Sequence, residues 1–322
     1  ILIALGVLPG CTTTPVSGRQ ALILVPFSQE MALGRQAFAE VLKKEKESED
    51  AKLRDIVERV GRRIAAVSEM PQLPWEFKLI ESKQQNAFAL PGGKTAVYTG
   101  ILPVCANEAG LAAVIGHEVA HVIARHGAQR MSQNLLIGVG MTAAAVSLSK
   151  SDQRGAILGA LGLGATLGLT LPFSRGMEAE ADEIGLIYMA RAGYDPMEAE
   201  RFWSRFAKIK QGPKPPEFLS THPADSTRIN RIRQFLPRAR AVYQRNPNKF
   251  GLGESFLVAL NRDKLPGSST ADSKTPEAAA PPAPPPSPQI AEKKNAQPAK
   301  KPASGASPSS SSRPVAHADP AP

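Results

Sequence analysis

The chain has 322 residues and a formal net charge of +10, which allows one large domain with additional segments or two small domains. From Pro266 onward it consists largely of Pro, Ala, Ser and Lys, a composition that cannot bury enough apolar surface to fold. We therefore exclude a second folded domain, and we expect one domain over residues 12–260 and a disordered tail over 261–322. The basic residues form no dense cluster and we find no nucleic-acid motif, so we expect a solvated basic surface and no nucleic-acid partner.

Residues 1–11 are a short apolar run that ends in small residues and Cys11. The pattern is typical of a secretory signal peptide whose start is missing. Its last four residues resemble a bacterial lipobox, although Pro9 is an unusual occupant, and an ordinary signal peptide is the alternative. We expect Cys11 to carry lipid and to anchor the chain at the periplasmic face of the cell envelope. The outer membrane is the expected site, because Thr12 is not an acidic retention signal. Cys105 then has no disulfide partner and is expected to be a buried apolar residue.

A polar, turn-rich stretch over residues 12–18 is expected to be a tether. Apolar residues at helical spacing follow it twice, and Ser28 is the expected N-cap of the first helix. Alternating patterns then predict short strands, the last two joined by a tight turn at Pro91–Gly93. The expected helices cover 28–46 and 53–67, and the expected strands cover 75–80, 86–90 and 95–99.

The sequence pattern predicts helices for the rest of the domain. Asn107 is a good N-cap for a long helix that Gly127 is expected to end. Strongly apolar stretches follow at 135–148 and 156–173, and further helices are expected over 177–192, over 197–210 and from Asp225 onward. Helices, a small sheet and then mostly helices indicate an α+β fold dominated by helix.

The sharpest motif is His117-Glu118-Val119-Ala120-His121, which lies in the long expected helix. Residues four apart share a helix face, so the two imidazoles can hold one Zn²⁺ ion. Glu118 lies about 100° around the helix, where it can reach a water molecule on the metal. Zinc lowers the pKa of such a water to about 7. The motif therefore predicts a hydrolase with Glu118 as its general base.

A third ligand has to come from elsewhere in the chain. Ala124 and Gly127 stand where a metzincin extension would place a glycine and a histidine, so that extension is absent. Glu178 is the better source, with Asp182 one helical turn further on to orient a histidine ligand. We expect Glu180, which lies off that face, to be solvated.

Two further histidines have alternative interpretations. His126 is expected to stabilise a helix C-terminus through its charge. His222 lies in a turn-rich segment, where it is either a capping or surface residue or a group that stabilises the oxyanion of the tetrahedral intermediate.

Five segments resemble the HtpX and CAAX-prenyl-protease family of gluzincin zinc peptidases, in particular its soluble, Oma-type bacterial lipoprotein branch. The resemblance covers about residues 12–240. Its carriers are residues 15–19 (PVSGR), 86–93 (NAFALPGG), 116–121 (GHEVAH), 174–182 (SRGMEAEAD) and 220–223 (STHP).

The resemblance implies a gluzincin-type zinc peptidase domain with one Zn²⁺ per chain. It implies that Glu178 is the third ligand, that Asp182 supports the ligands and that His222 acts in the transition state. It also implies that an edge strand binds an extended peptide substrate, which agrees with the physics of strand addition. This strand contains Asn86, Ala87, Phe88 and Ala89.

The apolar insert over residues 135–173 is predicted to form a helical hairpin. Residues 135–148 are too few to span a bilayer, whereas 156–173 are at the threshold and rich in glycine. We expect the hairpin to pack over or beside the active-site cleft and to touch lipid or control substrate entry. Insertion across the membrane is the alternative.

Together these features predict a zinc-dependent endopeptidase for unfolded or membrane-associated envelope proteins, acting in protein quality control. The main alternative is a catalytically latent, chaperone-like or assembly lipoprotein that keeps the peptidase fold. The complete set of ligands and base argues against that alternative, since a pure binding protein does not need Glu118. A third interpretation, a lipoprotein that binds the cell wall, rests only on the tail and the basic charge.

Overall fold

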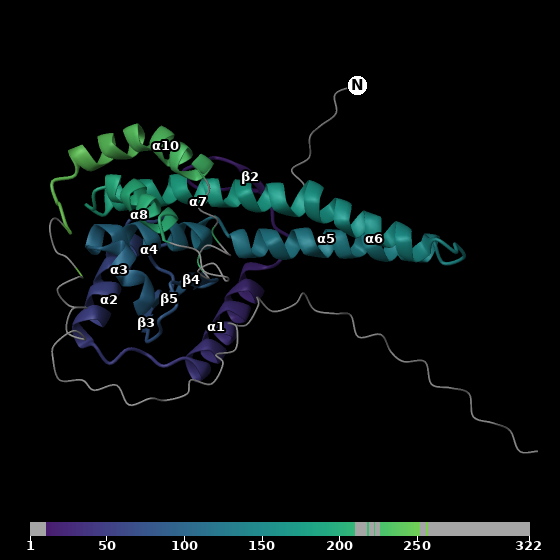
Figure 1. Ribbon diagram of the computed structural model, residues 1–322, viewed down its shortest axis with the longest axis horizontal. Coiled ribbons are helices and arrows are strands. Elements are labelled where there is room, and N and C mark those ends of the chain that lie inside the picture. The colour runs from purple at the N-terminus through teal and green to yellow at the C-terminus, as the bar shows by residue number, and fades with distance from the viewer. Residues whose placement is uncertain (1–10, 210–217, 219–221, 223–225, 252–255, 257–322) are drawn as a thin grey trace, which may run out of the picture. The chain divides into compact units, whose positions relative to one another are not determined.

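The computed structural model describes residues 11–209, 218, 222, 226–251 and 256 (Figure 1). Residues 1–10 of the expected signal peptide, the expected tail over 261–322 and most of the segment around His222 lie outside the described residues. The described chain is mostly helical with two small sheets, which confirms the predicted α+β class. The helices are α1 (Phe27–Lys44), α2 (Ala51–Ala66), α3 (Leu102–Cys105), α4 (Glu108–Ile123), α5 (His126–Ser147), α6 (Arg154–Ala165), α7 (Leu171–Arg191), α8 (Met197–Ala207) and α10 (Ser226–Arg245). A 3₁₀ turn, η1 (Thr99–Ile101), precedes α3, and a π-helical segment, η2 (Thr166–Thr170), joins α6 to α7.

A three-stranded sheet lies against α4 and contains all three expected strands. The strands are β3 (Glu76–Ile80), β4 (Ala87–Leu90) and β5 (Lys94–Tyr98), in the order β3-β5-β4. β5 pairs parallel to β3 and antiparallel to β4, so β4 is an edge strand of this sheet. The turn between β4 and β5 uses Gly92 and Gly93, which both have positive φ. This backbone conformation favours glycine.

Helix α4 is the central helix of the domain. The Asn107 side chain caps it by accepting a hydrogen bond from the Gly110 amide, as the sequence predicts. All of its residues except His121 are buried. The helix ends at Ile123 and not at Gly127, because Arg125 adopts a left-handed conformation with φ 55°. This break places His126 at the start of α5 and not at the C-terminus of α4.

Two glycines let α4 and α7 approach closely. A Cβ atom on Gly185 would lie 3.0 Å from the backbone of Gly116 and His117, so a side chain there would push the two helices apart by a few tenths of an ångström. The close approach places the histidine motif of α4 beside the acidic residues of α7. Helix α7 begins at Leu171, earlier than expected, because the apolar run before Met177 is also helical.

The N-terminal segment is not a tether. Strands β1 (Cys11–Thr13) and β2 (Gln20–Leu22) form an antiparallel hairpin, and Thr14 in its turn is buried. Polar side chains of this turn bond to α7 rather than to solvent. The expectation of a solvated linker is therefore wrong for residues 12–18.

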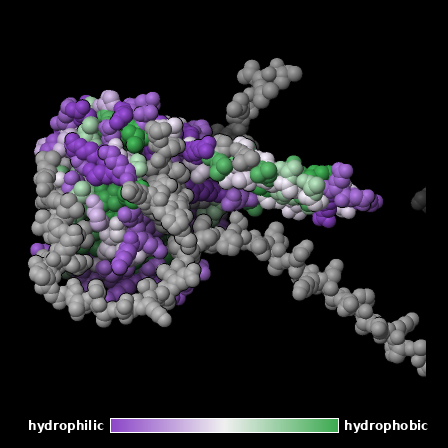
Figure 2. All heavy atoms as spheres, viewed as in Figure 1, coloured by the Kyte–Doolittle hydropathy of each residue, from purple (hydrophilic) through white to green (hydrophobic). Residues whose placement is uncertain are grey.

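The apolar insert forms the expected hairpin, in which α5 packs against α6. Its apolar side chains are not covered by the described chain, because no residue of α5 beyond Ser132 and none of α6 is buried. Figure 2 shows apolar residues along the hairpin and polar ones at its tip. This exposure argues against packing of the hairpin over the cleft, whereas the start of α5 does lie beside the predicted ligand Glu178, with a guanidinium nitrogen of Arg130 3.7 Å from its Oε1 atom. Among the described helices, the continuous stretch Arg154–Arg191 is long and apolar enough to cross a membrane.

Candidate functional site

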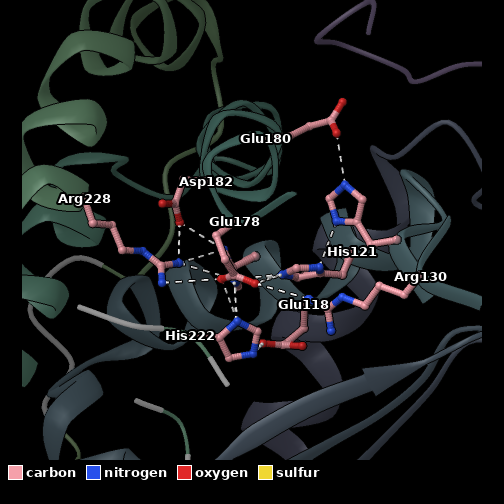
Figure 3. Close-up of polar contacts among 10 residues, drawn as sticks. Glu118, His121, Arg130, Glu178, Glu180, Asp182, His222 and Arg228 are labelled. Atoms are coloured by element: carbon pink, nitrogen blue, oxygen red, sulfur yellow. Dashed lines mark hydrogen bonds and ion pairs between the residues drawn. The ribbon is translucent and has the colours of Figure 1, made fainter. Parts of the chain in front are cut away.

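Two helices bring the predicted ligand residues together at one point. The Nε2 atoms of His117 and His121, on α4, lie 3.1 Å apart. From α7, the Glu178 carboxylate places one oxygen 3.2 Å from His117 Nε2 and the other 3.4 Å from His121 Nε2. Ligands about 2.0–2.1 Å from a tetrahedral zinc ion are separated by about 3.3 Å. The spacing of these atoms therefore fits a zinc site, and Figure 3 shows the carboxylate pointing at the imidazoles.

The electrostatics of Glu178 also fit a cation at this point. Its Oε1 atom is buried and has no hydrogen-bond partner among the described residues. Burial alone would raise the pKa of this carboxyl group, but the imidazoles of His222 and His121 outweigh burial and hold the pKa well below its usual range. Arg130 places a guanidinium nitrogen 3.7 Å from Oε1 without donating a hydrogen bond to it, so this buried oxygen remains available as a metal ligand.

Glu118 is buried beside this group without belonging to it. Its carboxylate lies near the backbone of Ala89 in the edge strand β4, and burial raises its pKa above the usual value. A raised pKa suits a base that has to take up a proton and release it again. Glu118 is thus not one of the grouped donors, although its Oε1 atom lies 3.4 Å from Nε2 of His222.

Asp182 and Arg228 contact the ligand His117 on the side of its ring that faces away from Glu178. The Oδ1 atom of Asp182 lies 3.0 Å from His117 Nδ1, the ring nitrogen that faces away from Glu178. Arg228, on α10, is fully buried and donates to the same oxygen at 2.6 Å. Its guanidinium also lies over the ring of Trp203, 3.5 Å from the ring centroid. This arrangement can fix the orientation and tautomer of His117.

His222 is buried in the same cluster and is not a surface residue. Its Nδ1 atom lies 2.8 Å from Glu178 Oε2 and 3.1 Å from His117 Nε2, and its Nε2 atom lies 3.4 Å from Glu118 Oε1. The ring packs against Phe218, whose carbonyl accepts the His222 backbone amide. His222 therefore joins the group of four residues whose donor atoms lie within 4.8 Å of one another.

Sequence reasoning missed two residues behind His121. Glu180, expected to be solvated, is 5% exposed, and His126, expected near a helix C-terminus, is 1% exposed. Burial would raise the pKa of Glu180, but hydrogen bonds from His126, Arg19, Ser17 and Thr14 lower it to about 2. Both expectations are wrong, because the chain turns at Arg125 and because the N-terminal hairpin covers α7. The PVSGR segment contains hydroxyl and guanidinium groups that need acceptors, but nothing in the sequence identifies Glu180 as that acceptor.

The predicted substrate strand lies along the open side of the site. Tyr98 N donates to Asn86 O at 3.0 Å, so this pair is hydrogen-bonded. Bonded and non-bonded pairs alternate along an antiparallel ladder. The backbone groups of Ala87 and Ala89 therefore face away from β5, toward the open edge, while the Phe88 ring packs near Tyr98.

Comparison with known proteins is consistent with this geometry. The sequence profile described as "Peptidase family M48" matches residues 49–236, which include both helices of the site. The mitochondrial metalloendopeptidase OMA1 of Schizosaccharomyces pombe is 41% identical over 233 residues, which are 70% of this chain and 66% of that protein.

Two bacterial relatives match a similar share of the chain. The beta-barrel assembly-enhancing protease of Yersinia pestis is 31% identical over 277 residues, 81% of this chain and 57% of that protein. The protein of the same name from Escherichia coli is 30% identical over 255 residues, 77% of this chain and 52% of its own length. The matches thus span between about half and two thirds of these relatives.

Proposed function

The chain belongs to peptidase family M48, whose members are gluzincin metallopeptidases, and we propose that it is a zinc-dependent endopeptidase acting on unfolded or membrane-associated proteins of the bacterial envelope. One observation carries this proposal. Three donor groups from α4 and α7 converge beside a buried carboxylate, Glu118, that is not one of them. A site that only bound metal would have no use for that carboxylate.

His117, His121 and Glu178 would hold the ion. When bound, zinc polarises the substrate carbonyl group and makes water acidic enough to lose a proton near neutral pH. Glu118 takes that proton and later passes it to the nitrogen of the leaving amine. Asp182 keeps the His117 ring in the orientation that presents Nε2 to the site, since its carboxylate accepts a hydrogen bond from Nδ1–H.

The open edge of β4 is the proposed binding site for the substrate backbone. The outward-facing backbone groups of Ala87 and Ala89 can pair with an extended peptide, which adds a strand to the sheet. Main-chain pairing makes little demand on substrate sequence, and only an unfolded or extended segment can provide it. This selectivity supports a role in quality control of misfolded proteins.

We further propose that the protein acts at a membrane surface on the periplasmic side. Cys11 is exposed and follows a lipobox-like sequence, so lipid attached there would tether the domain. The exposed leucine and valine side chains of the α5–α6 hairpin offer a second apolar contact. Bacterial relatives named for beta-barrel assembly support an envelope location, whereas the OMA1 relatives are named as mitochondrial.

Metal removal tests the proposed activity. We expect the purified chain to contain about one zinc ion, in line with the one group of donors among the described residues, and to cleave unfolded casein faster than a stably folded protein. Treatment with a chelator is expected to abolish cleavage, and added zinc should restore it. If cleavage is unaffected by complete removal of metal, the proposed function is wrong.

One observation favours the latent, chaperone-like alternative. His222 Nδ1 lies within the group of four donors, in the space that water or substrate would need. Substitution of His222 by alanine separates the two functions. An enzyme that needs His222 in the transition state loses cleavage, whereas a chain held latent by this histidine gains it.

A further inference from the structure

We propose that Glu180 and His126 are positioning residues that hold the ligand His121, and that the turn over residues 14–19 of the N-terminal hairpin locks them in place. The proposal rests on the proposed zinc site, because His121 matters as a ligand only if metal binds there. It assigns a role to the two buried residues that the catalytic scheme leaves unused.

The first step is the contact between the two histidine rings. His121 presents Nε2 to the other donors of the site, so Nδ1 is its remaining ring nitrogen. That nitrogen lies 2.8 Å from Nδ1 of His126. A neutral imidazole that binds metal through Nε2 carries its proton on Nδ1. His121 then donates and His126 accepts.

The second step follows from the first. With Nδ1 as an acceptor, neutral His126 carries its proton on Nε2. This nitrogen lies 3.0 Å from Glu180 Oε2, which accepts the hydrogen bond. With these tautomers of His121 and His126, each ring nitrogen has a partner: the metal for His121 Nε2, the other ring for each Nδ1, and the Glu180 carboxylate for His126 Nε2. Histidine ligands commonly donate their second ring nitrogen to such a partner, and loss of the partner weakens metal binding.

The third step is the group that holds Glu180. Around this buried carboxylate, Thr14 and Ser17 donate their hydroxyl groups and Arg19 donates Nε at 2.7 Å. Arg19 also reaches Gln129 Oε1 at 2.8 Å, which fixes the guanidinium against α5. The turn that carries these residues is itself closed by a hydrogen bond from the Thr14 amide to the Arg19 carbonyl at 2.8 Å.

The arrangement connects the site to the N-terminus of the described chain. Thr14 follows Cys11 by three residues. Its hydroxyl group bonds to Glu180, and Glu180 is connected through His126 to the proposed ligand His121. The geometry of His121 thus depends on a segment far from the histidine motif in sequence. Glu183, on the same helix, provides a matched contrast, because it pairs with the exposed Arg238 and has no contact of this kind with the site.

We call the hydrogen-bonded chain from His121 through His126 to Glu180 the relay. Two substitutions at residue 126 of the full chain test its two hydrogen bonds separately. The side-chain oxygen of asparagine takes the position of Nδ1, whereas the amide group of glutamine takes the position of Nε2. His126→Asn keeps an acceptor for His121, and His126→Gln keeps only the contact with Glu180. We expect zinc affinity, measured by competition with a chromophoric chelator, to fall about 10- to 100-fold in His126→Gln and to change less than about threefold in His126→Asn. The visible spectrum of the cobalt-substituted chain is expected to shift only in the glutamine variant.

Three controls keep the outcome interpretable. Arg19→Met tests the N-terminal turn without altering either histidine, and we expect about tenfold weaker zinc binding. Glu183→Gln is expected to bind zinc like wild type, and thermal unfolding of each metal-free variant reports on packing. Equal zinc affinity in wild type, His126→Gln and Arg19→Met overturns the relay, as does a loss that also occurs in Glu183→Gln. If wild type binds no zinc, the proposed function fails along with the relay.

Discussion

Three acidic side chains of α7, at positions 178, 180 and 182, show how neighbours decide the role of a residue. Glu178 faces the imidazoles of the site, Asp182 accepts from His117 and Arg228, and Glu180 accepts from His126. All three are buried, which is costly for carboxylates unless each is paired. Because each of these carboxylates is paired with a buried group, we expect an apolar replacement at any of the three positions to leave that partner uncompensated.

Asp182 offers a direct test at this scale. Asp182→Asn keeps the shape and can still accept from His117, but it removes the charge that polarises the ring. We expect zinc affinity to fall about 10- to 100-fold, as measured by chelator competition. Glu183→Gln, which removes a carboxylate of the same helix that pairs with the exposed Arg238, is the matched control. Unchanged zinc affinity in Asp182→Asn would show that this carboxylate does not support His117.

Part of the site could be predicted from the sequence, because the spacing of the two histidines in one motif also determines how they lie on a helix. His117 and His121 share a face of any regular helix, so their convergence could be predicted. Glu180 and His126 could not, because their burial depends on a left-handed turn at Arg125 and on a hairpin from the other end of the domain. No local pattern reports a partner that lies 161 residues away.

Among the elements, the edge strand β4 links the sheet to the site. Its outward-facing amide at Ala89 lies beside Glu118, and proline lacks that amide. Edge strands tolerate proline where the N–H faces outward. We expect Ala89→Pro to fold and bind zinc but to lose up to about tenfold in kcat/KM for casein, roughly the contribution of one hydrogen bond between neutral backbone groups. Ala89→Ser, which keeps the amide, should behave like wild type. Normal kcat/KM in the proline variant would exclude strand addition at this edge.

The exposed hairpin allows a prediction about lipid. Val139 and Val146 on α5 are 61% and 70% exposed, so replacing them with aspartate removes apolar surface without opening the core. We expect the double variant to unfold at the wild-type temperature but to sediment much less with anionic lipid vesicles. The unlipidated chain has to be used, so that the anchor does not mask the effect. Equal sedimentation of both chains would contradict lipid contact by this hairpin.

Element boundaries were predictable where a cap or a turn residue marks them. Asn107 and the Gly92–Gly93 turn are examples, since a side-chain acceptor and positive φ each have a local chemical cause. The start of α7 was missed because the glycine-rich run before it has no stop signal. The sequence left open whether the hairpin touches lipid or controls substrate entry, because apolar periodicity cannot tell a buried surface from an exposed one.

At the scale of the whole molecule, Arg228 ties three helices together. It extends from α10 to Asp182 on α7 and lies over Trp203 on α8, and it is fully buried. Removing one partner of a buried charged group costs about 3–5 kcal/mol. We expect Arg228→Met to lower the free energy of unfolding of the metal-free chain by about that amount in a denaturant titration. Arg238→Met, which removes an exposed ion pair, should cost at most about 1 kcal/mol. Equal costs would contradict the bridging role of Arg228.

The central claim is that the site combines metal binding with a separate general base, and Glu118→Gln tests it most directly. Glutamine fits the same space but cannot accept the proton from water. We expect this variant to bind zinc in the same amount as wild type and to show no measurable cleavage of casein. Cleavage at the wild-type rate by the zinc-loaded variant would contradict the account, because it would show that Glu118 is not the base.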